Sequence, residues 1–171
     1  MLTPRSRWLL AVVSFAFGAY QVACGHYVGF VLLAASAFLA YGYFKYGNVW
    51  LAFRAISAGK VDAAAELLQR VERPASLAAE ERGYYELSSG FVCAARAQNQ
   101  DAERHLRLAL ENQLRTDNDR ALAEAVLAQL LIARDELADA RSLLERAAAR
   151  SCRPAIAKRI QVLRDELPGG E

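Results

Sequence analysis

The chain has 171 residues, of which 54% are hydrophobic, and its 21 Lys and Arg against 19 Asp and Glu give a formal net charge of +2. This apolar content excludes a disordered chain, and without a basic stripe to contact phosphates we expect no nucleic-acid partner. The charges are distributed unevenly, because residues 8–44 carry none, whereas residues 46–171 carry all of the acids and have a net charge of −1. We therefore predict a membrane anchor at 1–45, followed by a soluble segment at 46–171.

The uncharged stretch consists of two apolar runs, at about 8–24 and 27–45, joined by the turn Cys24-Gly25-His26. Each run is close to the roughly 20 apolar residues that a membrane-spanning helix needs. Ser14 and Gly18 are four residues apart, as are Ser36 and Ala40, a spacing that lets two helices approach closely. The pattern predicts two transmembrane helices that form a hairpin, with the lipid bilayer as a partner.

The bases predict the orientation of this hairpin. Arg5 and Arg7 precede the first run, Lys45 follows the second, and the turn has neither Lys nor Arg. The positive-inside rule places such flanks in the cytoplasm. We therefore expect an integral protein of the inner (cytoplasmic) membrane, with both its N-terminus and its C-terminus in the cytoplasm.

A secretory signal is the competing interpretation of the first run. Arg5 and Arg7 before an apolar run fit such a signal, and Val22-Ala23-Cys24 resembles a lipoprotein cleavage site. Gln21 lies where that motif usually has an aliphatic residue. A second apolar run also follows at once, which an exported soluble protein would not need.

The soluble segment is rich in Ala, Leu, Glu, Arg and Gln, which favour helices, and no stretch alternates with period two. The fold class predicted for the whole chain is all-α. A repeat with a period of 38 runs through this segment and predicts three helix pairs, at about 47–72, 77–114 and 118–150, with a capping helix at 154–167. The repeated positions are Ala52, Gly90 and Ala128; Ala64, Ala102 and Ala140; Leu68, Leu106 and Leu144; and Val71, Ala109 and Ala147.

These positions resemble the tetratricopeptide repeat, a family with small residues at the helix crossings and a Gly near the turn. Gly59, Ala97 and Asp135 occupy the turn position of the three units. The period of 38 exceeds the family norm of about 34, and the proline that usually closes a unit is displaced to Pro74 or absent. The resemblance implies an α-solenoid of three helix pairs, whose first helices line a surface that binds a protein or peptide.

Aromatic and polar residues are expected on the outward side of those first helices. The candidate partner-binding residues are Trp50, Phe53, Tyr84, Phe91 and Gln129. An aromatic groove suits an apolar peptide or helix. The alternative is that these side chains pack against the membrane or an adjoining unit.

The sequence contains no recognisable catalytic constellation. His26 and His105 are isolated and are interpreted as surface histidines, and Glu80-Glu81 as the solvated start of a helix. The three cysteines have no partner at ligand spacing, so we expect neither a disulfide nor a metal site. We accordingly predict no enzyme activity, no cofactor, no metal and no small-molecule substrate.

The predicted function is that of a membrane-anchored, tetratricopeptide-like scaffold that binds a protein or peptide partner at the cytoplasmic membrane face. The alternative is an accessory subunit or assembly factor of a larger membrane protein complex, in which the transmembrane hairpin makes the specific contact. The sequence leaves self-association into a homo-oligomer open.

Overall fold

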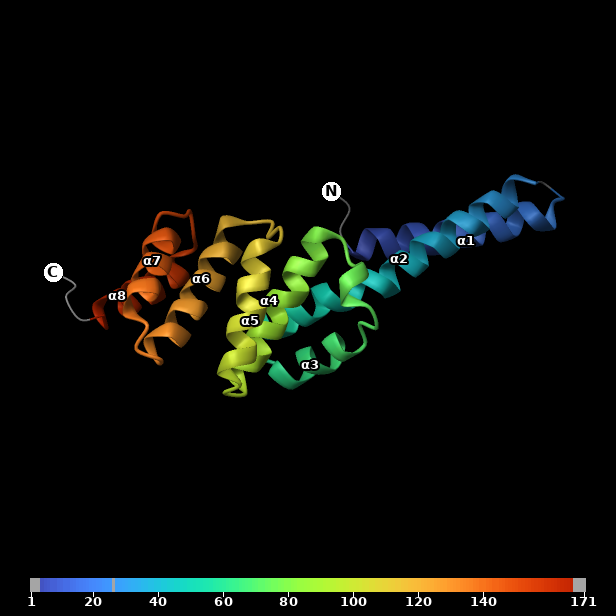
Figure 1. Ribbon diagram of the computed structural model, residues 1–171. Coiled ribbons are helices and arrows are strands. Elements are labelled where there is room, and N and C mark those ends of the chain that lie inside the picture. The colour runs from blue at the N-terminus through green and yellow to red at the C-terminus, as the bar shows by residue number, and fades with distance from the viewer. Residues whose placement is uncertain (1–3, 26, 168–171) are drawn as a thin grey trace. The chain divides into compact units, whose positions relative to one another are not determined.

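The computed structural model describes residues 4–25 and 27–167, and helices dominate this part of the chain (Figure 1). It has no strand among these residues, which confirms the prediction of an all-α fold. The helices are α1 (Pro4–Ala23), α2 (Val28–Ser57), α3 (Val61–Gln69), the short 3-10 helix η1 (Pro74–Ser76), α4 (Ala79–Ala95), α5 (Asn99–Glu111), α6 (Asp117–Ile132), α7 (Leu137–Ala148) and α8 (Pro154–Asp165).

The chain divides into two compact units, Met1–Asn48 and Val49–Glu171. In the first unit, α1 packs against the beginning of α2 through buried glycines. A Cβ atom added at Gly29 would lie 2.7 Å from the carbonyl oxygen of Gly18, so a larger residue would push the two backbones apart. The predicted close approach of two helices therefore occurs at Gly18, and its partner is Gly29.

The expectation of an integral membrane protein was wrong. Among the residues that the structure describes, no helix is both long enough and apolar enough to cross a bilayer. The predicted span at 8–24 falls in α1, where the uncharged run begins only after Arg7 and the helix ends at Ala23. The predicted span at 27–45 falls in α2, where the uncharged run begins at Val28 and stops at Lys45, while the helix continues to Ser57. The orientation inferred for these two helices therefore no longer has a basis.

Large apolar side chains are nevertheless exposed on the described part of the first unit. Tyr27 is 88% exposed and Val31 is 68% exposed. The side chains of this kind are Val13, Phe15, Phe17, Tyr20, Tyr27, Val28, Phe30 and Val31. An apolar surface of this extent is unusual on a free monomer.

In the second unit, consecutive helices pack as antiparallel pairs (Figure 1). The end of α2 packs on α3 through a core of Ala52, Ala64, Ala65 and Leu68, which Val92 of α4 completes. Helix α4 packs on α5, and α6 packs on α7. Contacts of α3 with α4, and of α5 with α6, join successive pairs, and α8 covers α6 and α7.

The turn within each pair repeats the same backbone geometry, with the period of the sequence repeat. Gly59, Ala97 and Asp135 adopt positive φ angles of 74°, 57° and 65°. The residue that follows each of them donates a backbone hydrogen bond to the carbonyl five positions earlier, at 2.9 Å for Lys60 to Ala55, 2.9 Å for Gln98 to Cys93 and 3.0 Å for Glu136 to Leu131. This pattern is a Schellman motif, which ends a helix through one left-handed residue. The sequence period is therefore also a period of the backbone.

Small residues fill the crossings between paired helices. Ala64, Ala102 and Ala140 are fully buried, as are Ala52 and Ala128. A Cβ atom at Gly90, the equivalent of Ala52 and Ala128, would lie 2.8 Å from Cγ of Leu106 on α5. The α4–α5 crossing is therefore too tight for the alanine that the other two crossings hold.

Replacing Gly90 should loosen the α4–α5 crossing. We expect Gly90→Val to lower the free energy of unfolding by about 1–3 kcal/mol, because the added atoms overlap Leu106. Urea unfolding of the full chain, followed by circular dichroism, measures this loss. Gly47→Val is the matched control, since a Cβ at Gly47 would meet no described atom within 4 Å apart from its chain neighbours and the backbone of its own helix. A loss there as large as at Gly90 would contradict the packing explanation.

Candidate partner-binding surface

Three of the predicted partner-binding residues form one aromatic cluster. The ring centroid of Trp50 lies 4.4 Å from that of Tyr84 and 6.3 Å from that of Phe53, and the Phe53 and Tyr84 centroids are 5.0 Å apart. Trp50 and Phe53 come from α2 and are half-buried, whereas Tyr84 of α4 is only 1% exposed. Trp50 and Phe53 are thus the members that present surface, and Tyr84 supports them from below.

The Tyr84 hydroxyl group connects α4 to the beginning of α6. It donates a hydrogen bond to Oδ2 of Asp119 at 2.5 Å and accepts one from the backbone N–H of Arg115 at 3.3 Å. Burial, reinforced by the hydrogen bond to the Asp119 carboxylate, raises the pKa of Tyr84 well above its ordinary value. The phenol therefore stays protonated and remains a donor at neutral pH.

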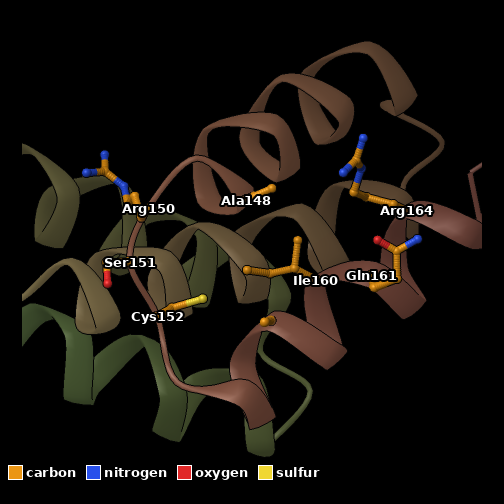
Figure 2. Close-up of a pocket in the computed structure, with 8 residues that line it drawn as sticks. Ala148, Arg150, Ser151, Cys152, Ile160, Gln161 and Arg164 are labelled. Atoms are coloured by element: carbon orange, nitrogen blue, oxygen red, sulfur yellow. The ribbon is translucent and has the colours of Figure 1, made fainter.

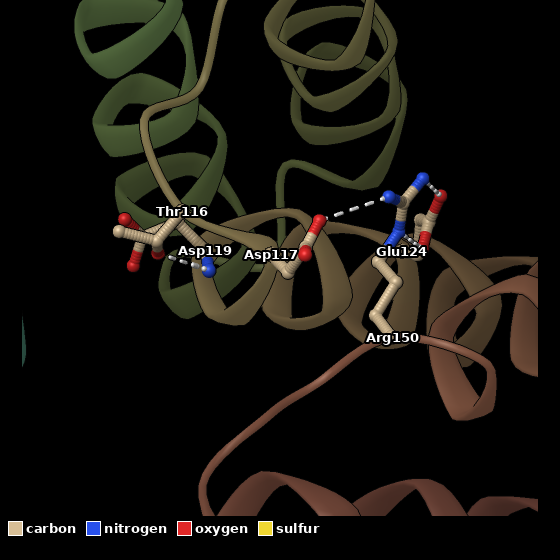
Figure 3. A network of polar contacts seen from close by, with 5 residues as sticks. All are labelled: Thr116, Asp117, Asp119, Glu124 and Arg150. Atoms are coloured by element: carbon tan, nitrogen blue, oxygen red, sulfur yellow. Dashed lines mark hydrogen bonds and ion pairs between the residues drawn. The ribbon is translucent and has the colours of Figure 1, made fainter.

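Thr116 fixes the position of Asp119. Its hydroxyl oxygen accepts a hydrogen bond of 3.1 Å from the backbone N–H of Asp119, which caps the N-terminus of α6 (Figure 3). The carboxylate of Asp119 lies in the first turn of that helix, where the helix dipole favours negative charge. The local sequence thus explains why this acid can be buried opposite Tyr84.

Arg115 completes the cluster from the loop between α5 and α6. Its guanidinium carbon lies 4.8 Å from the centroid of the Trp50 ring, a cation–π arrangement, and a guanidinium nitrogen lies 2.5 Å from Oε1 of Glu80. The side chains of Arg115 and Glu80 are about half and one third exposed. The surface around Trp50 therefore combines aromatic area with one balanced ion pair.

Phe91 and Gln129 lie apart from this cluster. Phe91 is half-buried on α4 and makes no ring contact with Trp50, Phe53 or Tyr84, all of which the structure describes. The exposed amide of Gln129 on α6 accepts a hydrogen bond of 2.6 Å from Arg159. The structure therefore brings three of the five predicted residues together, and the role of the set in partner binding stays a prediction.

Sequence reasoning missed Arg115, Asp119 and Glu80 as members of this surface. The Thr116-Asp117-Asn118-Asp119 segment carries the signal of a helix start, and Asp119 could have been placed from it. No sequence signal predicts that the loop returns Arg115 to Trp50, which lies far earlier in the chain.

Two buried carboxylates occupy equivalent positions in successive pairs. Glu86 of α4 and Glu124 of α6 are one repeat period apart, and they are 6% and 2% exposed. Nδ1 of His105 lies 2.6 Å from Oε2 of Glu86, whereas Arg150 donates two hydrogen bonds, of 2.9 Å and 3.0 Å, to the two oxygens of Glu124. His105 is thus a partly buried partner of Glu86, and its interpretation as a surface histidine was wrong. His26 lies outside the described residues.

The guanidinium of Arg150 also reaches Asp117 at 3.4 Å (Figure 3). The hydrogen bonds to Glu124 raise the pKa of Arg150, so the guanidinium group remains charged. A forked arginine on a buried carboxylate sets the register of α7 against α6.

A shallow pocket of about 360 Å³ lies between the end of α7 and α8 (Figure 2). Its lining residues are Ala148, Arg150, Ser151, Cys152, Ala157, Ile160, Gln161 and Arg164. Arg150 and Arg164 lie at opposite ends of the pocket, with Cys152 and Ile160 between them (Figure 2).

The described residues contain no group of three or more His, Cys, Asp or Glu side chains that could hold a metal ion. Cys24, Cys93 and Cys152 are free thiols, and burial raises the pKa of Cys93. A raised thiol pKa lowers the thiolate fraction, so Cys93 is a poor nucleophile.

Comparison of the chain with protein-family models, with curated proteins and with solved structures finds no match. The resemblance to the tetratricopeptide repeat therefore rests on the residues and turns described above.

Removing the Tyr84 hydroxyl group should destabilise the protein in a pH-dependent manner. At neutral pH, Tyr84→Phe should lower the free energy of unfolding by about 1–3 kcal/mol, because buried Asp119 loses its donor. The phenol pKa in the folded state exceeds the unfolded value of about 10. The contribution of Tyr84 is therefore fully present below about pH 10 and is lost as the pH rises through the folded pKa.

Urea unfolding at about pH 8 and about pH 11 measures this effect, and the gap between wild type and Tyr84→Phe should narrow at the higher pH. Tyr27→Phe is the control, since Tyr27 is 88% exposed. Loss of its hydroxyl group should leave the free energy of unfolding unchanged at both pH values. A gap that stays constant between the two pH values would refute the assigned role of the hydroxyl group.

Removing Arg150 should destabilise the protein, because buried Glu124 then lacks its hydrogen-bond partner. We expect Arg150→Met to lower the free energy of unfolding by about 2 kcal/mol or more, because the buried side chain of Glu124 loses both of its hydrogen bonds from Arg150. In the double variant Arg150→Met, Glu124→Gln, part of the lost free energy of unfolding should be recovered. Arg146→Met, in the last turn of α7 four residues earlier in the chain, is the control, with an expected change within about 0.5 kcal/mol. Equal losses for Arg146→Met and Arg150→Met would argue against a specific pair.

Proposed function

We propose that this protein is a scaffold of tetratricopeptide-like helix pairs that binds a protein or peptide partner. The supporting observation is the common period of the buried alanines and of the three left-handed turns at Gly59, Ala97 and Asp135. Stacked helix pairs of this kind form elongated surfaces suited to binding rather than to a chemical step.

The aromatic cluster is the part of this surface that we assign to the partner. Trp50 and Phe53 are half-buried, and their rings are held in place by Tyr84 and Arg115. Rigid, partly exposed aromatic residues beside an arginine are typical of binding hot spots. An apolar or aromatic side chain of a partner helix or peptide would pack against them.

Crosslinking tests this assignment directly. A photo-crosslinking residue placed at Phe53 or Arg115, in cells that naturally produce the protein, should give a discrete adduct with a partner protein. The same residue at Ser142, which is exposed on α7 and lies outside both the aromatic cluster and residues 146–164, is the control and should give none. Absence of an adduct at both Phe53 and Arg115 from folded protein would refute the proposal.

The partner recovered in this way allows a quantitative test. We expect Trp50→Ala to weaken its binding to the purified chain by about tenfold or more, as removal of a hot-spot aromatic does. Ser142→Ala should leave the affinity unchanged. Equal affinities of Trp50→Ala and wild type would place the contact elsewhere.

A second candidate is an accessory subunit of a larger protein complex, in which the helical hairpin of the first unit makes the specific contact. The exposed apolar side chains between Val13 and Val31 favour it, because such a surface marks an interaction site. Phe15→Ser with Phe30→Ser should then abolish co-purification with the complex, whereas Trp50→Ala should not. The opposite result favours the scaffold.

A further inference from the structure

The end of the second unit differs in charge from the rest of that unit. Residues 146–164 contain six Lys and Arg and no Asp or Glu, and with Asp165, Glu166 and Glu171 the whole stretch 146–171 has a formal net charge of +3. Residues 46–145, by contrast, have a formal net charge of −4. The six bases are Arg146, Arg150, Arg153, Lys158, Arg159 and Arg164. The basic end, as we name residues 146–164, comprises the last turn of α7, the following loop and most of α8.

Several of these cations are not neutralised. Glu124 and Asp117 hold Arg150, but Arg153, Lys158 and Arg164 form no ion pair with any residue in the described ranges 4–25 and 27–167. Elsewhere in the second unit, by contrast, arginines are commonly paired, as Arg96 is with Asp62. The basic end therefore carries positive charge that remains available to an external anion.

The pocket between α7 and α8 lies within this basic end. Arg150 and Arg164 border it, and the side chains of Ala148 and Ile160 provide apolar lining (Figure 2). Ala157 also lines the pocket. Its volume of about 360 Å³ is at the lower end of the range for ligand sites. A site of this size accommodates one or two side chains rather than a large cofactor.

We propose that the basic end binds an acidic segment of a partner protein, with an apolar side chain of that segment in the α7–α8 pocket. A carboxylate of the segment would pair with Arg164, which is free to rearrange, while Arg150 stays fixed on Glu124. A long nucleic acid fits less well, because the acidic remainder of the unit would repel its flanking phosphates. This site involves none of the residues of the aromatic cluster. A negative result for this site therefore does not contradict the proposed function, and a negative result for the aromatic cluster does not contradict this site.

The test uses a fluorescent peptide of sequence Glu-Glu-Leu-Glu-Glu-Leu-Glu, titrated into the full chain by fluorescence anisotropy. A control peptide of the same length carries Gln at every Glu position. We expect saturable binding of the acidic peptide only, weakening as salt is added. The triple variant Arg153→Gln, Lys158→Gln, Arg164→Gln should weaken binding by about tenfold or more.

The matched control removes three other exposed cations through Arg54→Gln, Lys60→Gln and Arg70→Gln, and binding should stay within about twofold of wild type. Equal weakening of peptide binding by the two triple variants would show that binding depends only on the net charge of the protein, and would overturn the proposal. Circular dichroism establishes that both variants are folded.

A second variant tests the pocket itself. Ala157→Phe keeps every cation and fills the apolar lining, so it should weaken the leucine-containing peptide but not a peptide with Gly in place of Leu. An unchanged affinity for the leucine-containing peptide would remove the pocket from the site. Tighter binding of a single-stranded oligonucleotide of equal charge would overturn the assignment to a protein segment.

Discussion

Two helices can cross closely only where the side chains between them are small, and the second unit depends on this constraint. Ala64, Ala102 and Ala140 are fully buried at one side of the three crossings, and Ala52, Gly90 and Ala128 lie at the other. Because the backbones approach closely, larger neighbours such as Leu106 and Leu144 are fully buried as well. The left-handed residue that ends each first helix returns the chain at the angle that this crossing requires.

The helix pairs share a backbone plan, but each junction has its own polar chemistry. Glu86 and Glu124 are equivalent in position, yet one pairs with a histidine and the other with a forked arginine. Tyr84 and Asp119 join α4 to α6 through a contact that has no equivalent elsewhere among the described residues. Buried polar pairs contribute little net stability, but a mismatched partner leaves a charge uncompensated. These pairs therefore specify which face of each helix packs against the neighbouring helix.

The two candidate binding surfaces differ in chemistry and in supporting elements. The aromatic cluster depends on α2, α4 and the loop that carries Arg115, so it exists only when successive helix pairs are joined. The basic end depends on α7 and α8 alone and draws its charge from one stretch of sequence. A scaffold with both could hold one partner through apolar contacts and another, or a second segment of the same one, through charge.

The sequence by itself determined the all-α class, because helix-favouring residues recur at helical spacing and leave no alternating stretch for a strand. It also placed Gly59, Ala97 and Asp135 at equivalent turns, since local backbone preference acts within a few residues. The sequence led to a wrong prediction of membrane-spanning helices for residues 8–44, because an uncharged run does not determine where a helix begins and ends. Helix α2, for example, continues through Lys45 to Ser57. Only the tertiary structure decided that Tyr84 is buried against Asp119, that His105 meets Glu86 and that Arg115 covers Trp50. Those contacts join residues that are distant in the chain, and their partners are chosen by how the helices pack rather than by local sequence.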